Sequence, residues 1–303
     1  MFADELFLKK GLSLEKLKNF VDVANAGGIA KVTDDVNRQS LISRQIKEME
    51  GFFGVELTRR KGKTLDLTAK GRHLAEIGQL QLTALDDFLK SCSNEEIVIS
   101  IGAGNSILEW LLLPRIKEIR NLMPRVKLDL RNFRSSELVR ELSERSLDLA
   151  IVRTNAIGVG LKHKPLGTLR YSLFVPRELI PQKRSRGKQW IKEVPIASLA
   201  TGQFYANLQS AYRRAKITLQ ISLICSSFTQ AAEALKSGAY GAILPSIAMH
   251  SLSSSDIEQI ELPWFSRETR QMSLAWNPRV AQVRDKLSPL IDILTVELKD
   301  ANI

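Results

Sequence analysis

The chain has 303 residues, of which 44% are hydrophobic and 25% are charged, and its formal net charge is +11. This length allows two or three domains that each bury a core, and the composition is that of an ordinary globular protein. The charge indicates an anionic partner, nucleic acid before membrane. No apolar run could span a membrane, and the acidic start MFADEL is unlike a secretion signal, so we expect a cytoplasmic protein.

Cysteine and histidine are too scarce and too scattered for a metal site or a disulfide framework. The cysteines are Cys92 and Cys225, and His73, His163 and His250 lie far apart in the sequence. Structural zinc sites usually take about four such ligands at short spacings, and disulfide scaffolds need more cysteines. We therefore predict neither a metal nor a cofactor.

The N-terminal region begins with two predicted helices and a turn. Apolar residues recur at helical spacing over 13–26, with Ser13 as N-cap and a Gly-Gly pair as the stop. Residues 29–36 can form a short second helix. A tight turn at Asn37 and Arg38 would separate it from a third helix.

The third helix, in the sequence RQSLISRQIKEMEGFFG, is amphipathic. Its apolar side, which we expect to be buried, consists of Leu41 or Ile42, Ile46, Met49 and Phe53. Its other side carries short polar and basic residues, namely Gln39, Ser40, Ser43, Arg44 and Lys47. Gly54 would end the helix.

A basic hairpin is predicted after the third helix. Residues 55–58 and 64–68 alternate between apolar and polar types, as strands do, and they flank the sequence RRKGK. This basic sequence would form the tip, since Gly62 allows a tight turn. Three helices and a basic hairpin predict a winged helix-turn-helix domain over residues 1–68.

This domain has the chemistry of a DNA-reading surface. From Arg38 to Arg72, nine Lys/Arg oppose four Asp/Glu, a net charge of +5. A helix fits the major groove of B-DNA, where Gln39 and Ser40 can reach base edges and Arg44 can form two hydrogen bonds to guanine. Phosphate contacts suit Ser43, Arg59, Arg60 and Lys63, and Lys47 completes the predicted DNA-binding set. The alternative is a polar helix face wetted by solvent.

These motifs resemble the DNA-binding domain of LysR-type transcriptional regulators. The sequences QSLISRQIKEME, FGVELTRR and LDLTAKG stand where that family typically has Q-P-A-V-S-R-Q-I-x-x-L-E, G-V-x-L-F-x-R and L-T-x-A-G. The resemblance covers about residues 14–74 and continues more weakly to the end of the chain. This chain has Ser40 where the family usually has Pro and Thr58 where it usually has Phe. The segment GGIAKVTDDVNRQ is also one residue shorter than its usual counterpart.

A long helix is predicted over residues 69–92, with Thr68 as N-cap. Two adjacent apolar stripes run along it: Leu74, Ile77, Leu80, Ala84 and Phe88, and beside them Leu82, Leu85 and Leu89. So wide a band favours pairing with another chain, whereas packing on its own domain would use one stripe. In the resembled family this is the linker helix of the dimer, which implies a homodimer or homotetramer bound to two half-sites.

Residues 93–303 alternate between strand and helix patterns after the polar break SCSNEE. Such alternation predicts parallel-rich sheets covered by helices. Helices are predicted at 107–122, 136–145, 204–215, 229–237 and 280–299. The basic segment from Lys162 to Lys192 has nine Lys/Arg and one Glu, net +8, and its part PRELIPQKRSRGKQW is predicted to be a solvated loop.

Polar residues stand at the ends of several predicted strands, where helices begin. The candidate effector-binding residues are Asn105, Ser106, Arg153, Thr154, Thr201, Gly202 and Phe228. Such loops enclose ligands in α/β proteins, although each residue also suits a helix cap or a turn. The sequence IGAGNS could instead indicate a dinucleotide site, but Ile107 occupies the place of its third glycine. The donors and the positive charge favour a small anionic effector, such as a carboxylate.

The resemblance also implies how these elements are grouped. The effector-binding domain of LysR-type regulators is similar to periplasmic binding proteins, and its chain crosses twice between two lobes. Lobe one would comprise about 95–161 and 269–303, and lobe two about 162–268. The expected fold is a multidomain α/β protein with an N-terminal winged helix-turn-helix, a long linker helix and a C-terminal two-lobed α/β effector domain.

The sequence thus predicts a sequence-specific transcriptional regulator that binds double-stranded DNA and a small-molecule effector, with RNA polymerase as a further candidate partner. A ligand between the lobes would change their closure and so the angle between paired DNA-binding domains. An enzyme that uses the lobes is an alternative, but no Ser-His-Asp set, paired carboxylates or metal cluster stands out. A ligand-binding module that has lost DNA reading is a third interpretation.

Overall fold

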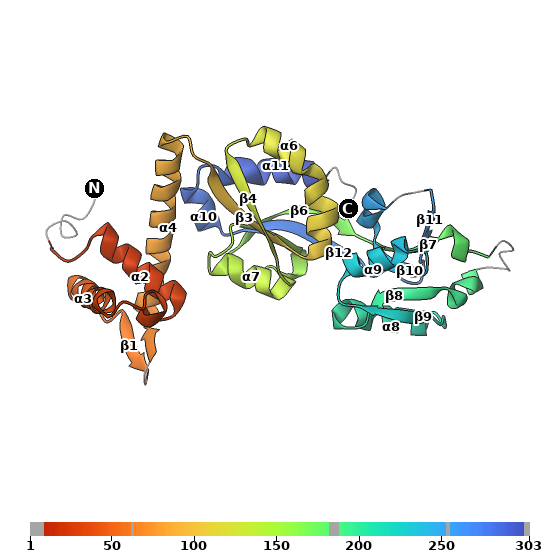
Figure 1. Cartoon of the computed structure of the whole chain (residues 1–303), viewed down its shortest axis with the longest axis horizontal. Helices are drawn as coiled ribbons and strands as arrows, with labels where there is room; N and C mark the ends of the chain where they lie inside the picture. Colours follow the sequence, from red (N-terminus) through yellow and green to blue (C-terminus); the bar gives the residue numbers. More distant parts are fainter. Residues whose placement is uncertain (1–8, 62–63, 182–187, 253–254, 300–303) are drawn as a thin grey trace. The chain divides into compact units, whose positions relative to one another are not determined.

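The computed structural model describes residues 9–61, 64–181, 188–252 and 255–299 (Figure 1). The chain divides into two compact units. The first consists of residues 1–95 and 282–284, and the second of residues 96–281 and 285–303. Within the described stretches, no helix is both long and apolar enough to cross a membrane.

The first helix among the described residues of the first unit confirms the predicted boundaries. Helix α2, Leu14–Ala26, begins after Ser13, whose side chain accepts a hydrogen bond from the N–H of Lys16. It ends at Gly27, which has a φ of 72°. Only glycine adopts this left-handed conformation without strain, so the Gly-Gly pair stops the helix for a conformational reason.

The region before the third helix differs from the prediction. The expected helix over 29–36 is a single 3₁₀ turn, η1, Ile29–Lys31. Helix α3, Val36–Phe53, starts earlier than expected because the side chain of Asp35 accepts the N–H of Asn37 and caps the helix. The predicted turn at Asn37 and Arg38 is therefore wrong, since both residues are helical.

The core of the first unit lies between α2, α3 and the hairpin. Its buried residues are Phe20, Val23, Ile42, Ile46, Met49 and Leu57. The predicted seam of α3 is correct for Ile42 rather than Leu41, which is exposed. At the end of α3 the buried ring is that of Phe52, whereas the predicted Phe53 is 36% exposed. Ile46 and Met49 are buried as predicted, so the seam differs from the prediction at its last residue.

The hairpin forms, and its second strand agrees with the predicted one, whereas its first strand lies later in the chain than predicted. Strands β1, Thr58–Lys61, and β2, Thr64–Leu67, pair antiparallel. The basic residues Arg59, Arg60 and Lys61 thus lie in β1 and not at the tip. The predicted turn residues Gly62 and Lys63 lie outside the described residues.

Helix α4, Ala69–Cys92, follows the hairpin, and Thr68 caps it as predicted by accepting the N–H of Gly71. Two glycines let α4 approach its neighbours closely. A Cβ at Gly71 would stand 2.9 Å from the carbonyl carbon of Leu57 and closer still to its oxygen. A Cβ at Gly78 would stand 2.8 Å from side-chain carbons of Leu17 and Val21. Neither position has room for a larger residue.

The second unit has two five-stranded sheets. The first sheet has the order β4-β3-β5-β12-β6. Its strands are β3 Ile97–Ala103, β4 Val126–Asn132, β5 Leu149–Arg153, β6 Lys162–Leu169 and β12 Arg270–Trp276. The second sheet has the order β11-β7-β10-β8-β9. Its strands are β7 Tyr171–Pro176, β8 Pro195–Leu199, β9 Gln220–Cys225, β10 Gly241–Pro245 and β11 Ile257–Glu261.

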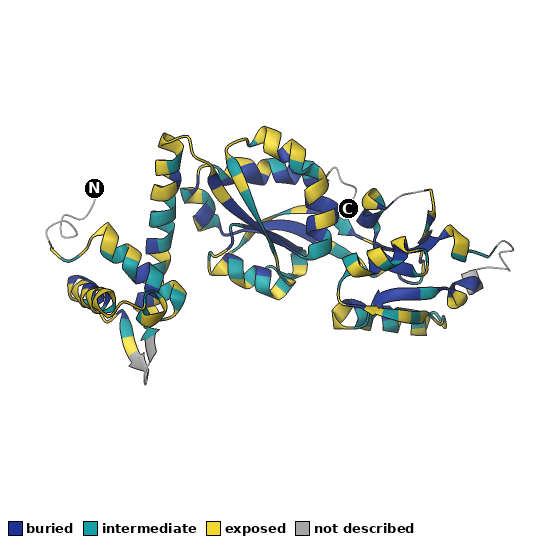
Figure 2. Ribbon diagram, viewed as in Figure 1, coloured by how far each residue is buried: buried dark blue, intermediate teal, exposed yellow. Residues whose placement is uncertain are grey.

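Helices cover both sheets, and the strands beneath them are largely buried (Figure 2). Around the first sheet lie α5 Asn105–Ile107, η2 Leu108–Leu112, η3 Leu113–Arg115, α6 Ile116–Leu122, α7 Ser135–Ser143, η4 Thr154–Ala156, α10 Pro278–Val283 and α11 Leu287–Lys299. Figure 1 shows α6 and α11 on one face and α7 on the other. With the second sheet lie η5 Arg177–Leu179, η6 Lys188–Glu193, α8 Gly202–Arg214, α9 Phe228–Lys236 and η7 Ser246–Ser251.

The lobe boundary differs from the predicted one. The sequence places residues 162–169 in lobe two, but β6 pairs with β12 in the first sheet. The chain therefore crosses between the sheets at Arg170, and it returns before β12. The basic segment is also less solvated than predicted, because Trp190 and Ile191 are 5% and 2% exposed and belong to the core.

Two predicted helices are interrupted. The one over 107–122 is divided into α5, a π-helical turn η2, a 3₁₀ turn η3 and α6, with Pro114 in the 3₁₀ turn. The one over 280–299 is divided into α10 and α11, and Arg284 lies in the break.

Candidate DNA-binding surface and effector site

Helix α3 exposes most of the side chains predicted to read DNA. Ser40, Arg44 and Lys47 are exposed, while Ser43 is half-buried. The side chain of Arg44 is 72% exposed, and its Nε lies 3.7 Å from Glu48 Oε1 one turn along the helix. So weak an exposed pair leaves the guanidinium available to a base or a phosphate.

Gln39 is partly engaged within its own domain. Its Nε2 donates to the carbonyl oxygen of Thr33 at 2.8 Å, and the side chain is half-buried. This bond orients the amide before any partner arrives. The side-chain oxygen of Gln39 remains an acceptor at the start of α3, where it suits a base amino group.

The basic strand β1 carries Arg59, whose side chain is 61% exposed and faces Asp66 Oδ2 at 3.4 Å. The side chain of Arg60 and the whole of Lys63 lie outside the described residues. Of the hairpin residues predicted to contact phosphates, Arg59 is therefore the one whose side chain the structure describes.

Glu50 fastens the hairpin to α3. Its Oε1 accepts hydrogen bonds from the N–H groups of Leu57 and Thr58, at 2.8 and 2.9 Å, and from Thr58 Oγ1 at 3.0 Å. Thr58, the departure from the family pattern, thus adds a donor to this carboxylate. The bonds fix the start of β1 relative to the helix that would enter the groove.

We expect Glu50→Ala to destabilise the first unit by about 1–3 kcal/mol, because it leaves two backbone N–H groups near the core without an acceptor. Thermal unfolding of the full-length protein measures this loss, and DNA affinity should fall with it. Glu56→Ala is the matched control, since Glu56 is exposed. Equal stability of the two variants would contradict the role given to Glu50.

A second polar network fixes α2 against α3. Gln45 is 6% exposed, accepts from Asn19 Nδ2 at 2.7 Å and donates to Glu15 Oε1 at 3.2 Å. The sequence suggested no role for Gln45, although its position between the apolar residues Ile42, Ile46 and Met49 indicates that it faces the core. Its buried amide is satisfied on both sides.

Helix α4 carries the exposed apolar residues predicted for a partner chain. Ile77, Leu85, Phe88 and Leu89 are 45%, 47%, 67% and 66% exposed. Single exposed apolar residues are common, but four on one helix form a surface that usually is covered by another protein.

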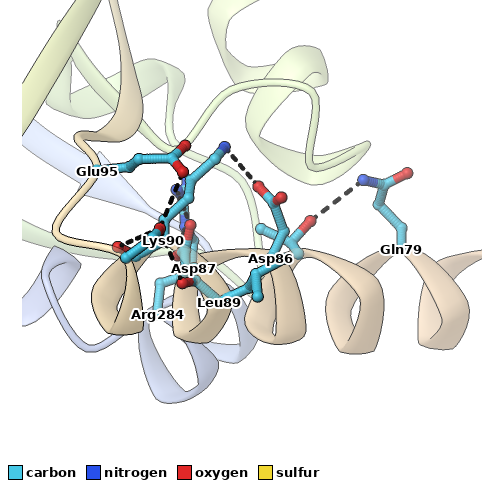
Figure 3. A network of polar contacts seen from close by, with 9 residues as sticks. Gln79, Asp86, Asp87, Leu89, Lys90, Glu95 and Arg284 are labelled. Carbon is cyan, nitrogen blue, oxygen red and sulfur yellow. Dashed lines mark hydrogen bonds and ion pairs between the residues drawn. The ribbon is translucent and has the colours of Figure 1, made fainter.

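A buried ion pair lies beside this surface (Figure 3). Asp87 accepts from Arg284 Nε at 2.6 Å and from Arg284 Nη2 at 3.0 Å, and the two side chains are 9% and 6% exposed. Lys90, on the same helix, bonds the more exposed Asp86 at 2.6 Å. Sequence reasoning missed the buried pair, although an aspartate within the apolar band of α4 could have indicated it.

In the second unit, a side-chain bond joins two of the predicted effector-site helices. Asn105 Nδ2 donates to Thr229 Oγ1 of α9 at 3.1 Å and to Glu109 Oε1 at 2.9 Å. Thr229 Oγ1 lies 2.9 Å from Ser227 Oγ, which caps α9. Asn105 belongs to the first turn of α5 itself rather than to a preceding loop as predicted.

An aromatic cluster lies where the chain crosses from the first sheet to the second. The ring of Tyr171, the first residue of β7, lies 4.9 Å from that of Phe204 and 5.8 Å from those of Phe228 and Phe265. The guanidinium carbon of Arg270 lies 5.4 Å from the centroid of Tyr171 and 5.9 Å from that of Phe204. Such stacking stabilises the cation over the rings.

The hydroxyl of Tyr171 is buried and has no hydrogen-bond partner among the residues that the structure describes. Burial raises the pKa of Tyr171 to about 12, although the positive charges of Arg270 and Arg153 favour the phenolate. Tyr171 therefore stays a neutral donor at physiological pH.

The other predicted effector residues differ in whether they contact the aromatic cluster or other side chains. Arg153 Nε donates to Ser135 Oγ at 3.3 Å, and Thr154 Oγ1 lies 2.7 Å from Ser273 Oγ. Phe228 belongs to the aromatic cluster. Thr201 and Gly202 are exposed at the start of α8, and Ser106 is half-buried in α5.

Sequence reasoning missed Tyr171, Phe204 and Arg270 at this site. Tyr171 and Arg270 stand at the first positions of strands that follow the two crossings, which is where residues of two lobes meet. Because the sequence predicts the lobe boundary after residue 161, it does not place Tyr171 next to a crossing between the lobes. Among the described residues, no group of three or more His, Cys, Asp or Glu side chains could hold a metal ion.

Two families match the chain. Residues 94–296 match the family described as LysR substrate binding domain, and residues 14–72 match the family described as bacterial regulatory helix-turn-helix protein, lysR family. The two matches cover separate parts of the chain.

The relatives are distant. The HTH-type transcriptional regulator AlsR of Bacillus subtilis is 26% identical over 199 residues, which cover 62% of this chain and 65% of AlsR. The HTH-type transcriptional regulator HdfR of Yersinia enterocolitica is 26% identical over 206 residues, 66% of this chain and 70% of HdfR. For HdfR of Yersinia pestis the similarity, at 28% identity, spans 46% of this chain and about half, 49%, of the relative.

Solved structures share the fold. A full-length OxyR variant from Pseudomonas aeruginosa has a TM-score of 0.62 at 18% identity, over 95% of both chains. Full-length CbnR, in a complex with its target DNA, has a TM-score of 0.54 at 19% identity, over 96% of this chain and 100% of CbnR.

Proposed function

Because the chain belongs to the LysR family of bacterial helix-turn-helix regulators, we propose that it regulates transcription by binding double-stranded DNA at specific sequences. The observation that carries this proposal is the exposed polar face of α3, with Ser40, Arg44 and Lys47, next to the basic strand β1. Neither an enzyme nor a module without DNA reading would require that face.

In the proposed complex, α3 enters the major groove. Arg44 pairs with a guanine, and Gln39 and Ser40 contact base edges near the start of the helix. Ser43, Lys47 and Arg59, with Arg60 and Lys63, bind phosphates and provide the salt-dependent part of the affinity. The Glu50 bonds hold β1 and α3 in one register, so both sets of contacts form together.

We further propose that the protein works in the cytoplasm as a homodimer or homotetramer. The exposed residues Ile77, Leu85, Phe88 and Leu89 of α4 would pair with a second copy. Two copies bind two half-sites, with a spacing that the dimer geometry sets. RNA polymerase is the proposed partner at the promoter.

The second unit is proposed to bind a small-molecule effector between its lobes. Residues of both lobes would contact the effector, namely Asn105, Arg153, Thr154 and Phe228. The remaining candidates for effector contacts are Ser106, Thr201 and Gly202. A ligand shifts the protein only by its difference in affinity between two arrangements. Effector binding would thereby change the affinity of the oligomer for DNA.

The test compares two arginines on a duplex selected from random sequences by the full-length protein. We expect Arg44→Ala to reduce discrimination at one base pair by about 1–3 kcal/mol, because a two-bond contact to guanine is lost. Arg59→Ala should instead weaken all sequences alike and lower the slope of log affinity against log salt by about one.

Gel-shift titrations at several salt concentrations measure both effects. Unchanged sequence preference in Arg44→Ala would remove the base-reading role of Arg44. Failure of the unmodified protein to select any sequence would overturn the proposed function.

A further inference from the structure

We propose that the second unit binds a small aromatic carboxylate at the crossing site, which we define as Arg153, Tyr171, Phe204, Phe228 and Arg270. The inference rests on the proposed effector-sensing function and names the class of effector. The carboxylate would be held by the two arginines and the Tyr171 hydroxyl, and the ring would lie against the phenylalanines.

The strand register places the two arginines on one face of the first sheet. Arg153 of β5 is directly opposite Met272 of β12, and Arg270 lies two residues before Met272 on the same strand. Residues two apart on a strand point to the same side, so the arginines are diagonal neighbours. Among the described residues, neither guanidinium forms an ion pair with a carboxylate. Two like charges so placed favour an anion between them.

Glu268 is a carboxylate whose negative charge acts on Tyr171, and it is already engaged. Its carboxylate accepts from Asn207 Nδ2 at 2.7 Å and lies 3.7 Å from Arg214 Nη2. The arginines of the crossing site therefore keep a net positive charge. A carboxylate with a planar pair of oxygens suits the fork of a guanidinium better than a single-point acceptor does.

The Tyr171 hydroxyl supplies the third donor. It is buried, it has no partner among the described residues, and it stays protonated because burial raises its pKa to about 12. A buried hydroxyl without a partner is unfavourable, and an incoming oxygen would correct this. Because the hydroxyl is neutral, it does not repel an anion.

The apolar surroundings indicate that the ligand has a ring. Tyr171 and Phe204 are buried, while Phe228, Arg153 and Arg270 are half-buried and can be reached from solvent. The rings of Phe204 and Phe228 meet edge to face, with centroids 4.8 Å apart. Flat aromatic ligands gain from such neighbours beyond the area that they bury, and inorganic anions do not.

Calorimetric titration of the full-length protein with benzoate tests the inference. We expect benzoate to bind at least tenfold more tightly than neutral benzamide, which lacks the charge, and than phosphate, which lacks the ring. Arg270→Gln and Tyr171→Phe should each weaken benzoate binding at least fivefold. Arg267→Gln, a change of an exposed arginine near the same strand, should leave it unchanged.

Two outcomes would overturn the inference: benzamide or phosphate that binds as tightly as benzoate, and equal affinity of Arg270→Gln and Arg267→Gln for benzoate. Tyr171→Phe keeps the ring and its packing, so its loss of binding would report the hydroxyl alone. DNA binding is measured on the same samples. Loss of benzoate binding with DNA binding intact removes only the ligand class, whereas protein that never binds DNA removes the proposed function.

Discussion

Arg284→Met is expected to destabilise the first unit by about 3–5 kcal/mol, because it leaves the carboxylate of Asp87 buried without a counter-charge. The two oxygens of Asp87 accept from two nitrogens of Arg284, and water reaches neither side chain well. Methionine retains most of the volume of the arginine side chain, so the loss of stability would come from the missing charge rather than from lost packing. Hydrogen exchange of the α4 amides measures the change. Tryptophan fluorescence does not, since Trp110, Trp190, Trp264 and Trp276 belong to the second unit.

The double variant Asp87→Leu with Arg284→Met tests whether the loss of stability comes from one unpaired buried charge or from the substitution of Arg284 itself. Replacing both members of a buried pair by apolar residues is often neutral or stabilising, so stability should return close to that of the unmodified protein. The pair of Asp86 and Lys90, which is more exposed, is the control, and Lys90→Met should cost less than about 1 kcal/mol. If Arg284→Met costs no more than Lys90→Met, the buried pair has no structural role.

Gly71→Ala is expected to have the second large effect. The new Cβ would collide with the carbonyl oxygen of Leu57, so either α4 or the start of the hairpin must move. Overpacking usually costs about 1–3 kcal/mol, and backbone on the opposing side cannot yield as a flexible side chain can, so we expect at least the upper value. Circular dichroism during thermal unfolding measures the loss, and DNA binding should weaken because Leu57 immediately precedes strand β1 of the hairpin.

Gly51→Ala is the matched control for this variant. Gly51 is an exposed helical glycine of α3, and a methyl group added there would meet no neighbouring atom within 4 Å. Alanine in an exposed helix is favoured over glycine by up to about 1 kcal/mol, so this variant should be slightly more stable than the unmodified protein. Equal thermal stability of the two glycine variants would show that α4 does not approach the backbone of Leu57 closely at Gly71.

The parts of the fold that the sequence predicts are those set by local chemistry. Ser13 and Thr68 cap helices where their hydroxyls are expected to, and Gly27 and Gly54 end helices with left-handed backbone. Asp35 also caps a helix with its side chain, but the prediction does not include this cap and therefore misplaces the start of α3. The LysR resemblance, confirmed by the two matching families, supplies the order of the domains.

The parts that the sequence does not predict depend on contacts between residues distant in the chain. The membership of β6 in the first sheet is decided by its pairing with β12, which lies beyond the whole of lobe two. The crossing site likewise joins residues from β5, β7, α8, α9 and β12. A single sequence does not show that the strand ends that carry Tyr171 and Arg270 meet. The DNA-binding and effector residues remain predictions for the experiments above.

The segment Gln282–Arg284 has a consequence for dissecting the protein by truncation. These residues belong to the first unit, although they are separated from residue 95 by most of the chain. A recombinant fragment that stops at Glu95 would retain Asp87 and lose its counter-ion Arg284. We expect such a fragment to be less stable than the same residues in the intact chain, because Asp87 would lack its counter-charge. An operator affinity measured with it would then underestimate that of the full-length protein.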